Sequence, residues 1–339
     1  AKDGKAYHGY KQKKIDGKYY YFNEHGQMLY NWIIATGDGA PNLKDNEDNG
    51  IVDGDISSMQ YAFNVDKGWR VNGWLQVDGS YNMERENDED WYFFDDGDVE
   101  YAKATDKTNV ALLLSDYGID DRYRAKIKEE GKWFCFDEDG RMKTGLQAIA
   151  DGDDYDVYYF DESGFMKTGK VSNVELENGD TANFYFETSN SKKGRGVTGE
   201  ESGYLYYKGM RLEAEDDYEF FAIPDGEDAN GDEQFEIYLV NTNGKIQKGT
   251  GSNGKKVDPE KIENNDYALY DYIENNIGDD EDVDDFDVYV KTDKNGKVTW
   301  VKFNDGTSGL ADREALDLEV NNFVTYANDA EEVDFGWED

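Results

Sequence analysis

The chain has 339 residues, of which 77 are acidic and 36 are basic, and its net charge is −41. A field this negative repels phosphate backbones and anionic lipid, so we exclude nucleic acid and membrane surfaces as partners. Aromatic residues make up 15% of the chain. Disordered acidic chains are poor in aromatic residues, so this composition indicates folded, ring-rich layers joined by acidic loops.

Along the chain, an aromatic triplet recurs, followed by a polar turn, a glycine and a second short run. The clearest copies are Tyr20–Phe22 with Gly26 and Met28, Phe134–Phe136 with Gly140 and Met142, and Tyr158–Phe160 with Gly164 and Met166. Alternating aromatics favour strands, and a turn with a glycine at positive φ favours a β-hairpin. A lone hairpin is marginal in water, so each copy has to bury its face against the next one.

Looser copies of the same pattern bring the count to eight hairpins. They are Tyr61–Phe63 with Gly68, Tyr92–Phe94 with Gly97, Phe184–Phe186 with Gly194, Leu205–Tyr207 with Gly209, and Ile237–Leu239 with Gly244. Val288–Val290 with Gly296 is a candidate ninth copy. A Thr-Gly or Asn-Gly pair ending at Gly73, Gly145, Gly169 or Gly199 marks the corner between hairpins. Residues 1–256 are therefore predicted to form a mainly β solenoid of stacked β-hairpin repeats with acidic insertions.

The C-terminal part, residues 257–339, is predicted to be a small α+β region, either a cap or a separate domain. Asp258 and Pro259 fit the N-cap and first position of a helix, and Gly278 fits its end. Residues 287–303 read as a further hairpin around Asn295-Gly296. The apolar spacing from Leu316 to Ala327 predicts a final helix.

Two segments, Gly17–Met28 and Trp133–Gly145, resemble the cell-wall-binding repeats. This family includes choline-binding repeats of pneumococcal surface proteins, streptococcal glucan-binding repeats and receptor-binding repeats of large clostridial toxins. The resemblance covers about Lys5 to Thr250, with degenerate repeats in most copies. It implies a secreted or cell-surface protein of a Gram-positive bacterium, which binds a cell-wall polymer or another carbohydrate, including choline-bearing polymer, in grooves between hairpins.

In choline-binding members, an aromatic cage combines the tryptophan after the corner glycine with the first aromatic of the next run. Carried over to this sequence, the resemblance implies a cage of Trp74 and Trp91, with Tyr101 as a third ring. Trp32 follows a second such corner, where Asn31 replaces the glycine. Ring faces attract quaternary ammonium groups and also stack on sugars. The alternative is that these rings pack between hairpins as core.

An acidic insertion resembles the first nine positions of a calcium-binding loop. Its oxygen ligands would be Asp45, Glu47, Asn49 and Asp53, but Ile56 stands where such loops carry a bidentate glutamate. Calcium is therefore the candidate ion, and the sequence indicates no other cofactor. The alternative is a solvated acidic insertion without a metal.

The sequence shows no motif for enzyme chemistry. Gly-x-Ser-x-Gly, phosphate-loop and His-Glu-x-x-His patterns are absent, and no pair of carboxylates stands out. We therefore expect a protein that is not an enzyme. The alternative to carbohydrate binding is a surface spacer or adhesin platform whose acidic loops bind a basic host protein. We expect no membrane span, because no run of eighteen apolar residues is present.

Overall fold

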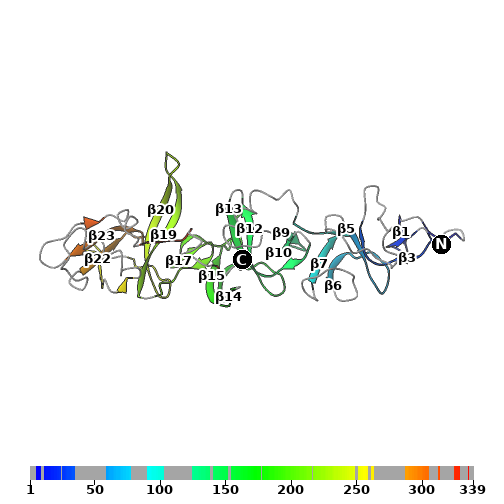
Figure 1. The fold of residues 1–339 in the computed structure, drawn as a ribbon, viewed down its shortest axis with the longest axis horizontal. Coiled ribbons are helices and arrows are strands. Elements are labelled where there is room, and N and C mark those ends of the chain that lie inside the picture. Colours follow the sequence, from blue (N-terminus) through cyan, green and yellow to red (C-terminus); the bar gives the residue numbers. More distant parts are fainter. Residues whose placement is uncertain are drawn as a thin grey trace. The chain divides into compact units, whose positions relative to one another are not determined.

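The computed structural model describes residues 5–8, 11–23, 25–34, 59–77, 90–102, 124–137, 140–151, 154–176, 178–215, 217–248, 251–258, 261–262, 287–304, 312–313, 324–328 and 335. These residues form strands and no α-helix, which confirms a mainly β fold (Figure 1). This part of the chain also holds no helix long and apolar enough to span a membrane. The described residues up to Lys167 form one compact unit, unit 1, and those from Thr168 onward form unit 2.

Unit 1 consists of small antiparallel sheets, each built around one aromatic triplet. The sheets have the strand orders β1-β2-β3, β4-β5, β6-β7-β8, β11-β10-β9 and β12-β13. The strands are β1 Lys11–Ile15, β2 Lys18–Phe22, β3 Met28–Leu29, β4 Asn31–Ile34, β5 Met59–Phe63, β6 Gly73–Val77, β7 Asp90–Asp95, β8 Asp98–Val99, β9 Arg124–Glu129, β10 Lys132–Asp137, β11 Met142–Lys143, β12 Gly145–Asp151 and β13 Asp154–Phe160.

The triplet strand pairs on both sides, and its longer partner is the strand that precedes it. In β10, Trp133 pairs with Lys128 of β9, whereas Phe136 pairs with Met142 of the short strand β11. The predicted hairpin, in which the triplet strand pairs with the Gly-x-Met run, is thus confirmed. It forms the side of the sheet with the shorter pairing. The predicted corner is also confirmed, because β12 begins a new sheet at Gly145, whose φ is 75°.

An Asx turn closes the short half of these sheets. In the copy after β13, Oδ1 of Asp161 accepts hydrogen bonds from the backbone N–H groups of Ser163 and Phe165, at 3.0 Å each. Asn23, Asn241 and Asp293 cap their own turns in the same way. The recurring Asp or Asn after the triplet therefore satisfies the backbone donors of the turn, which explains why the sequence places it there.

Consecutive hairpins contact each other in one register. A Cβ atom built on Gly164 would clash with the sulfur of Met142, which lies two residues after the turn glycine of the preceding hairpin. The same offset recurs in pairs from both units: Gly68 on Met28, Gly97 on Arg70, Gly244 on Arg211 and Gly296 on Ile246. In these pairs, the turn glycine of one hairpin packs against the preceding hairpin, as expected of hairpins that cannot bury their faces alone.

Unit 2 contains a five-stranded sheet, β14-β15-β18-β17-β16, a three-stranded sheet, β20-β19-β25, and a four-stranded sheet, β21-β22-β23-β24. The strands are β14 Gly169–Glu175, β15 Thr181–Phe186, β16 Gly199–Glu201, β17 Tyr204–Tyr207, β18 Met210–Arg211, β19 Tyr218–Glu227, β20 Glu233–Asn241, β21 Lys255–Val257, β22 Asp287–Thr292, β23 Val298–Asn304, β24 Asp312–Arg313 and β25 Val324–Tyr326. One core cluster joins Phe220 and Leu239 to Val288 and Val301. The predicted domain boundary at residue 256 lies within this unit, and the core takes residues from both sides of it.

The C-terminal region differs in part from the sequence-based prediction. The hairpin at residues 287–303 is confirmed as β22 and β23. The predicted final helix is wrong at its C-terminal end, because Val324–Tyr326 form β25, which pairs in parallel with β19. Val324 and Thr325 are β-branched and almost fully buried, so they fit a strand that is covered on both faces. The helix predicted from Asp258 lies mostly outside the described residues.

Candidate ligand-binding site

Trp74 and Trp91 lie together on one face of the β6-β7-β8 sheet. Trp74 pairs with Phe93 and Gln76 pairs with Trp91 across β6 and β7. Since residues two apart on a strand share a face, the side chains of Trp74, Trp91 and Phe93 all project from the same side. The centroids of the two indole rings are 6.4 Å apart, with an interplanar angle of 73°. The structure thus brings together the two tryptophans that the resemblance implies as cage residues.

The two rings differ in their surroundings. The side chain of Trp91 is 39% exposed. Trp74 is half-buried, and its ring centroid lies 5.0 Å from that of Phe93, 4.7 Å from that of Phe134 and 6.1 Å from that of Phe136. Trp74 therefore packs on the aromatic cluster of the next hairpin, which agrees with the alternative that these rings form part of the core. Trp91, in contrast, presents ring surface to solvent.

Tyr101 does not join this pair, and Trp32 belongs to another sheet. Tyr101 packs against a cluster that contains Tyr92 and Phe94, whose side chains alternate with those of Trp91 and Phe93 along β7. Tyr101 therefore lies on the opposite face of the sheet and does not complete a three-ring cage. The backbone of Trp32 pairs with Ala62 in the β4-β5 sheet, a different sheet from that of Trp74.

A buried ion pair anchors the start of the strand that carries Trp91. Nε of Arg141 lies 3.4 Å from Oδ2 of Asp90, and the two side chains are 11% and 12% exposed. Burial raises the pKa of the neighbouring Tyr92 phenol far above its ordinary range, while the Arg141 charge opposes this rise. Because Asp90 directly precedes Trp91, the pair fixes that end of β7 to the following hairpin.

Lysines of the chain cover most of the other tryptophan rings that the structure describes. Nζ of Lys18 lies 3.7 Å from the centroid of the Trp69 ring. Lys126 lies 5.3 Å from the Trp133 ring and Lys302 lies 4.9 Å from the Trp300 ring. Within the described part of the chain, no lysine or arginine lies over the ring of Trp74 or Trp91. Trp91 is therefore an exposed tryptophan over whose ring no lysine or arginine of the described residues lies.

The prediction from the sequence missed these lysines, although the sequence contains a signal for the position of Lys126. Glu130 and Gly131 form a two-residue turn in which both residues have positive φ, 49° and 83°. Such a turn fixes the register of a hairpin. Alternation in β9 then places Lys126 and Lys128 on the face of the sheet that carries Trp133.

The candidate calcium ligands Asp45, Glu47, Asn49 and Asp53 lie outside the described residues. Among the residues that are described, no group of three or more His, Cys, Asp or Glu side chains could hold a metal ion. The calcium hypothesis stays a prediction.

A scan against protein-family models and a search of curated proteins give no match. Solved structures do match, among them choline binding protein F from Streptococcus pneumoniae, which is 15% identical over 88% of this chain and 92% of that chain, with a TM-score of 0.34. CbpJ from Streptococcus pneumoniae TIGR4 is 20% identical over 73% of this chain and 89% of that chain, with a TM-score of 0.22. Alternansucrase in complex with isomaltononaose is 14% identical over 88% of this chain and 18% of that chain, with a TM-score of 0.23.

Proposed function

We propose that this chain is a non-catalytic binding module for a cell-wall polymer or another glycan, and that the ring of Trp91 contacts the ligand. The observation that carries this proposal is the 39% exposure of Trp91, beside a half-buried Trp74 that fixes its position. A large aromatic ring held open to water offers a face for stacking on a sugar or for attracting an ammonium group. The resemblance of the repeats to the cell-wall-binding family supports the same function, at a secreted or cell-surface location.

The charge of the chain restricts the chemistry of the ligand. A net charge of −41 disfavours an anionic polymer and tolerates a neutral glycan. It favours a polymer that carries positive groups, such as the quaternary ammonium of choline. The alternative function, a platform for a basic host protein, rests on the net charge alone.

We further propose that the hairpins continue as a solenoid. The supporting observation is the constant offset, in five pairs of hairpins, between a turn glycine and the residue that it contacts in the preceding hairpin, as for Gly164 on Met142 and Gly296 on Ile246. Units that contact only their neighbours in one register build a one-dimensional array.

The test of the binding site is a titration of the full chain with choline, with glucan oligosaccharides and with soluble peptidoglycan fragments. Trp91→Ala is expected to weaken binding of the active ligand roughly ten-fold, which corresponds to the 1–2 kcal/mol that one ring face contributes. Trp91→Phe should keep part of the affinity. Trp69→Ala is the matched control, because Lys18 already covers the Trp69 ring, and it should leave the affinity unchanged.

Thermal melts of the same variants separate binding from packing. Trp91→Ala should cost at most about 1 kcal/mol of stability, since its ring is open and touches the edge of Trp74. Trp74→Ala should cost about 3–5 kcal/mol through the cavity it leaves among the phenylalanines. Unchanged affinity in Trp91→Ala, or an equal loss in Trp69→Ala, would show that Trp91 is not the binding residue. Capture of a basic protein that is insensitive to Trp91→Ala would instead favour the platform.

A further inference from the structure

The first hairpins carry a charge opposite to that of the whole chain. Residues 1–36 contain six lysines and three acidic residues, a net charge of +3, whereas residues 37–339 carry −44. The structure brings two lysines of the first segment together with one from the next hairpin. These are Lys14, Lys18 and Lys67, whose side chains are all exposed. We call these three lysines the lysine patch.

Two aromatic rings hold the ammonium groups of the lysine patch. Nζ of Lys14 lies 5.2 Å from the centroid of the Tyr19 ring, which is its cross-strand partner between β1 and β2. Nζ of Lys18 lies 3.7 Å from the centroid of the Trp69 ring, and Nζ of Lys67 lies 5.0 Å from the same centroid. Both rings are half-buried. Three positive charges from two consecutive hairpins of unit 1 thus lie around two rings.

Arg70 fixes the two rings beside each other. Its backbone N–H donates to the carbonyl oxygen of Tyr19 at 2.8 Å, so the segment that carries Trp69 is held against β2. The Arg70 guanidinium lies 4.5 Å from the centroid of the Tyr19 ring and pairs with Asp96 at 3.1 Å. The charge of Arg70 is therefore already paired, and we do not count it in the lysine patch.

The lysine patch faces rings instead of carboxylates. Among the described residues, none of its ammonium groups lies within 4.0 Å of a carboxylate oxygen, although Asp16 and Asp66 are within two residues of these lysines in sequence. Lys167, Lys248 and Lys261, in contrast, pair with carboxylates at 3.4, 2.9 and 3.2 Å. A ring attracts an ammonium group through its quadrupole and has no net charge, so it does not cancel the positive field.

We propose that the lysine patch binds an acidic saccharide, which is a sugar chain whose carboxylates contact the ammonium groups. The inference does not depend on ligand binding at Trp91. Ammonium groups spread over two rings match single charges that are spaced along a chain. The half-buried rings also offer apolar surface beside these charges, which suits a sugar better than an inorganic anion.

The net charge of the whole chain does not prevent this binding. A charge of −41 acts against an anionic ligand when it is summed over the molecule. At physiological ionic strength, however, the Debye length is about 8 Å, so exposed charges farther away are largely screened. The local field therefore decides at the lysine patch. A sugar carboxylate carries one charge and a phosphate monoester nearly two, so the carboxylate is repelled less by the rest of the chain.

The test is a calorimetric titration of the full chain with oligogalacturonate at about 0.15 M salt. We expect saturable binding to the unaltered chain and roughly ten-fold weaker binding to the triple variant Lys14→Gln/Lys18→Gln/Lys67→Gln, because each exposed ion pair contributes only a small part. The variant with arginine at the same three positions should keep the affinity, since arginine keeps the charge. A neutral isomalto-oligosaccharide should bind the unaltered chain and the glutamine variant equally.

The matched control is Lys170→Gln/Lys192→Gln/Lys193→Gln. These three lysines are exposed, belong to unit 2 and lie outside the lysine patch. Their replacement changes the net charge by the same three units, so it separates the local field from the charge of the whole chain. The control variant should bind oligogalacturonate as the unaltered chain does.

Three results would overturn the proposal. The first is equal affinity of the glutamine variant of the lysine patch and of the control variant for oligogalacturonate. The second is tighter binding of inorganic tripolyphosphate than of oligogalacturonate, which would indicate a phosphate site. The third is tighter binding of polyglutamate with the same number of charges, which would indicate a surface for an acidic protein.

A measurement without substitutions covers the case in which the glutamine variant does not fold. Dimethylation of the lysines with a carbon-13 label keeps their charge and gives each one a signal in nuclear magnetic resonance spectra. Oligogalacturonate should shift the signals of Lys14, Lys18 and Lys67 and leave those of Lys192 and Lys193 in place. Equal shifts in the two groups would show that the ligand does not select the lysine patch.

Discussion

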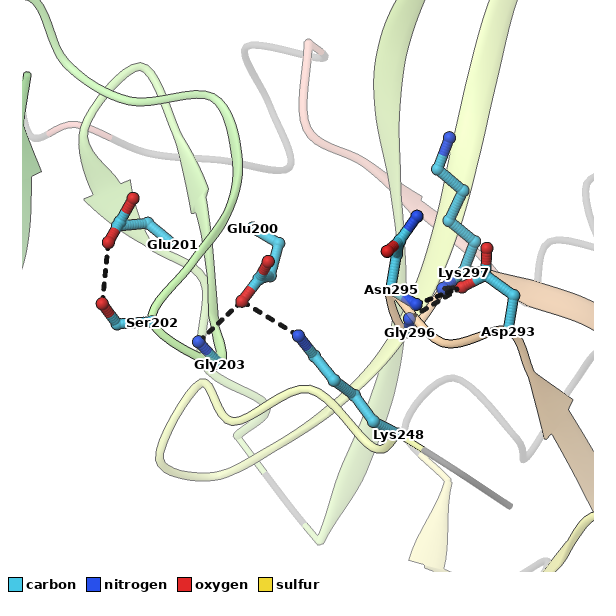
Figure 2. A network of polar contacts seen from close by, with 9 residues as sticks. All are labelled: Glu200, Glu201, Ser202, Gly203, Lys248, Asp293, Asn295, Gly296 and Lys297. Carbon is cyan, nitrogen blue, oxygen red and sulfur yellow. Dashed lines mark hydrogen bonds and ion pairs between the residues drawn. The ribbon is translucent and has the colours of Figure 1, made fainter. Parts of the chain in front are cut away.

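At the scale of single residues, Glu200 shows how one charged group links three turns of unit 2. Figure 2 shows its carboxylate between the backbone N–H of Gly203, at 2.8 Å, and Nζ of Lys248, at 2.9 Å. The hydrogen bond from Lys248 lowers the pKa of Glu200, and partial burial opposes this. The stem of Lys248 also lies against the turn at Gly296, where a Cβ atom would stand 3.2 Å from Cγ of Lys248.

Lys248→Met keeps this stem and removes the charge, so it isolates the ion pair. The side chains of Lys248 and Glu200 are 30% and 33% exposed, so the loss of stability at pH 7 should be less than about 1 kcal/mol. The pKa of Glu200 lies below its ordinary value of 4.5 in the folded chain. Its contribution is therefore present above pH 4.5 and is lost as the pH falls through the lowered pKa.

Urea unfolding of the original chain and of Lys248→Met between pH 7 and pH 3 measures this effect. The difference in free energy of unfolding should shrink at the acidic end of the series. Lys167→Met, which removes the exposed pair with Asp161 in unit 1, is the control for a lysine that does not contact Glu200. If the difference in free energy of unfolding between the original chain and Lys248→Met stays constant with pH, the effect comes from packing of the Lys248 side chain and not from the ion pair.

At the scale of the hairpin, the contact that repeats is the one between a turn glycine and the residue two positions after the preceding turn glycine. We call this contact the seat of the turn glycine. Gly164 has a φ of 79°, and a Cβ atom there would meet the sulfur of Met142 and lie 3.1 Å from Cδ1 of Phe134. Gly131 has a similar φ of 83° in the same unit, but a Cβ atom there would meet nothing within 4 Å. Substitution of Gly131 therefore tests backbone strain alone, whereas substitution of Gly164 tests backbone strain together with contact with the neighbouring hairpin.

We expect Gly131→Ala to cost about 1–2 kcal/mol, the penalty for a left-handed backbone. Gly164→Ala should cost about 1–3 kcal/mol more, because the added methyl group overpacks the seat. Met142→Ala in the Gly164→Ala chain should recover part of that excess, whereas Met142→Ala in the Gly131→Ala chain should not recover any stability. Equal losses in the two single variants, measured by thermal and urea unfolding, would show that the seat does not couple the hairpins.

At the scale of the whole molecule, the solenoid makes a measurable prediction about size. A compact chain of this length has a radius of gyration of about 20 Å, and an unfolded one about 66 Å. A solenoid should give a value clearly above the compact one, with a long tail in the distance distribution. Solution scattering should be recorded at about 0.15 M salt or more, since the net charge of −41 otherwise adds repulsion between molecules. A radius near 20 Å would contradict the array.

The sequence by itself determined the local architecture of this protein. The two-residue alternation of triplets such as Phe134–Phe136, the Asp or Asn that follows them and the corner glycines were enough to place the strands and turns. These features act over a few residues, through backbone conformation and hydrogen bonds within the turn, so they can be read without knowing the neighbours. The same signals brought Trp74 and Trp91 to one sheet.

Only the tertiary structure decided which faces and strands meet. It placed Tyr101 on the far side of β7, turned Val324 into a strand beside β19, and set Lys126 between rings of two hairpins. These outcomes depend on burial and on partners distant along the chain, and such pairings override local propensity. Contacts between hairpins decide whether a ring is exposed, packed or covered by a lysine. The sequence pattern of one hairpin does not show which side chains of the neighbouring hairpin it will contact.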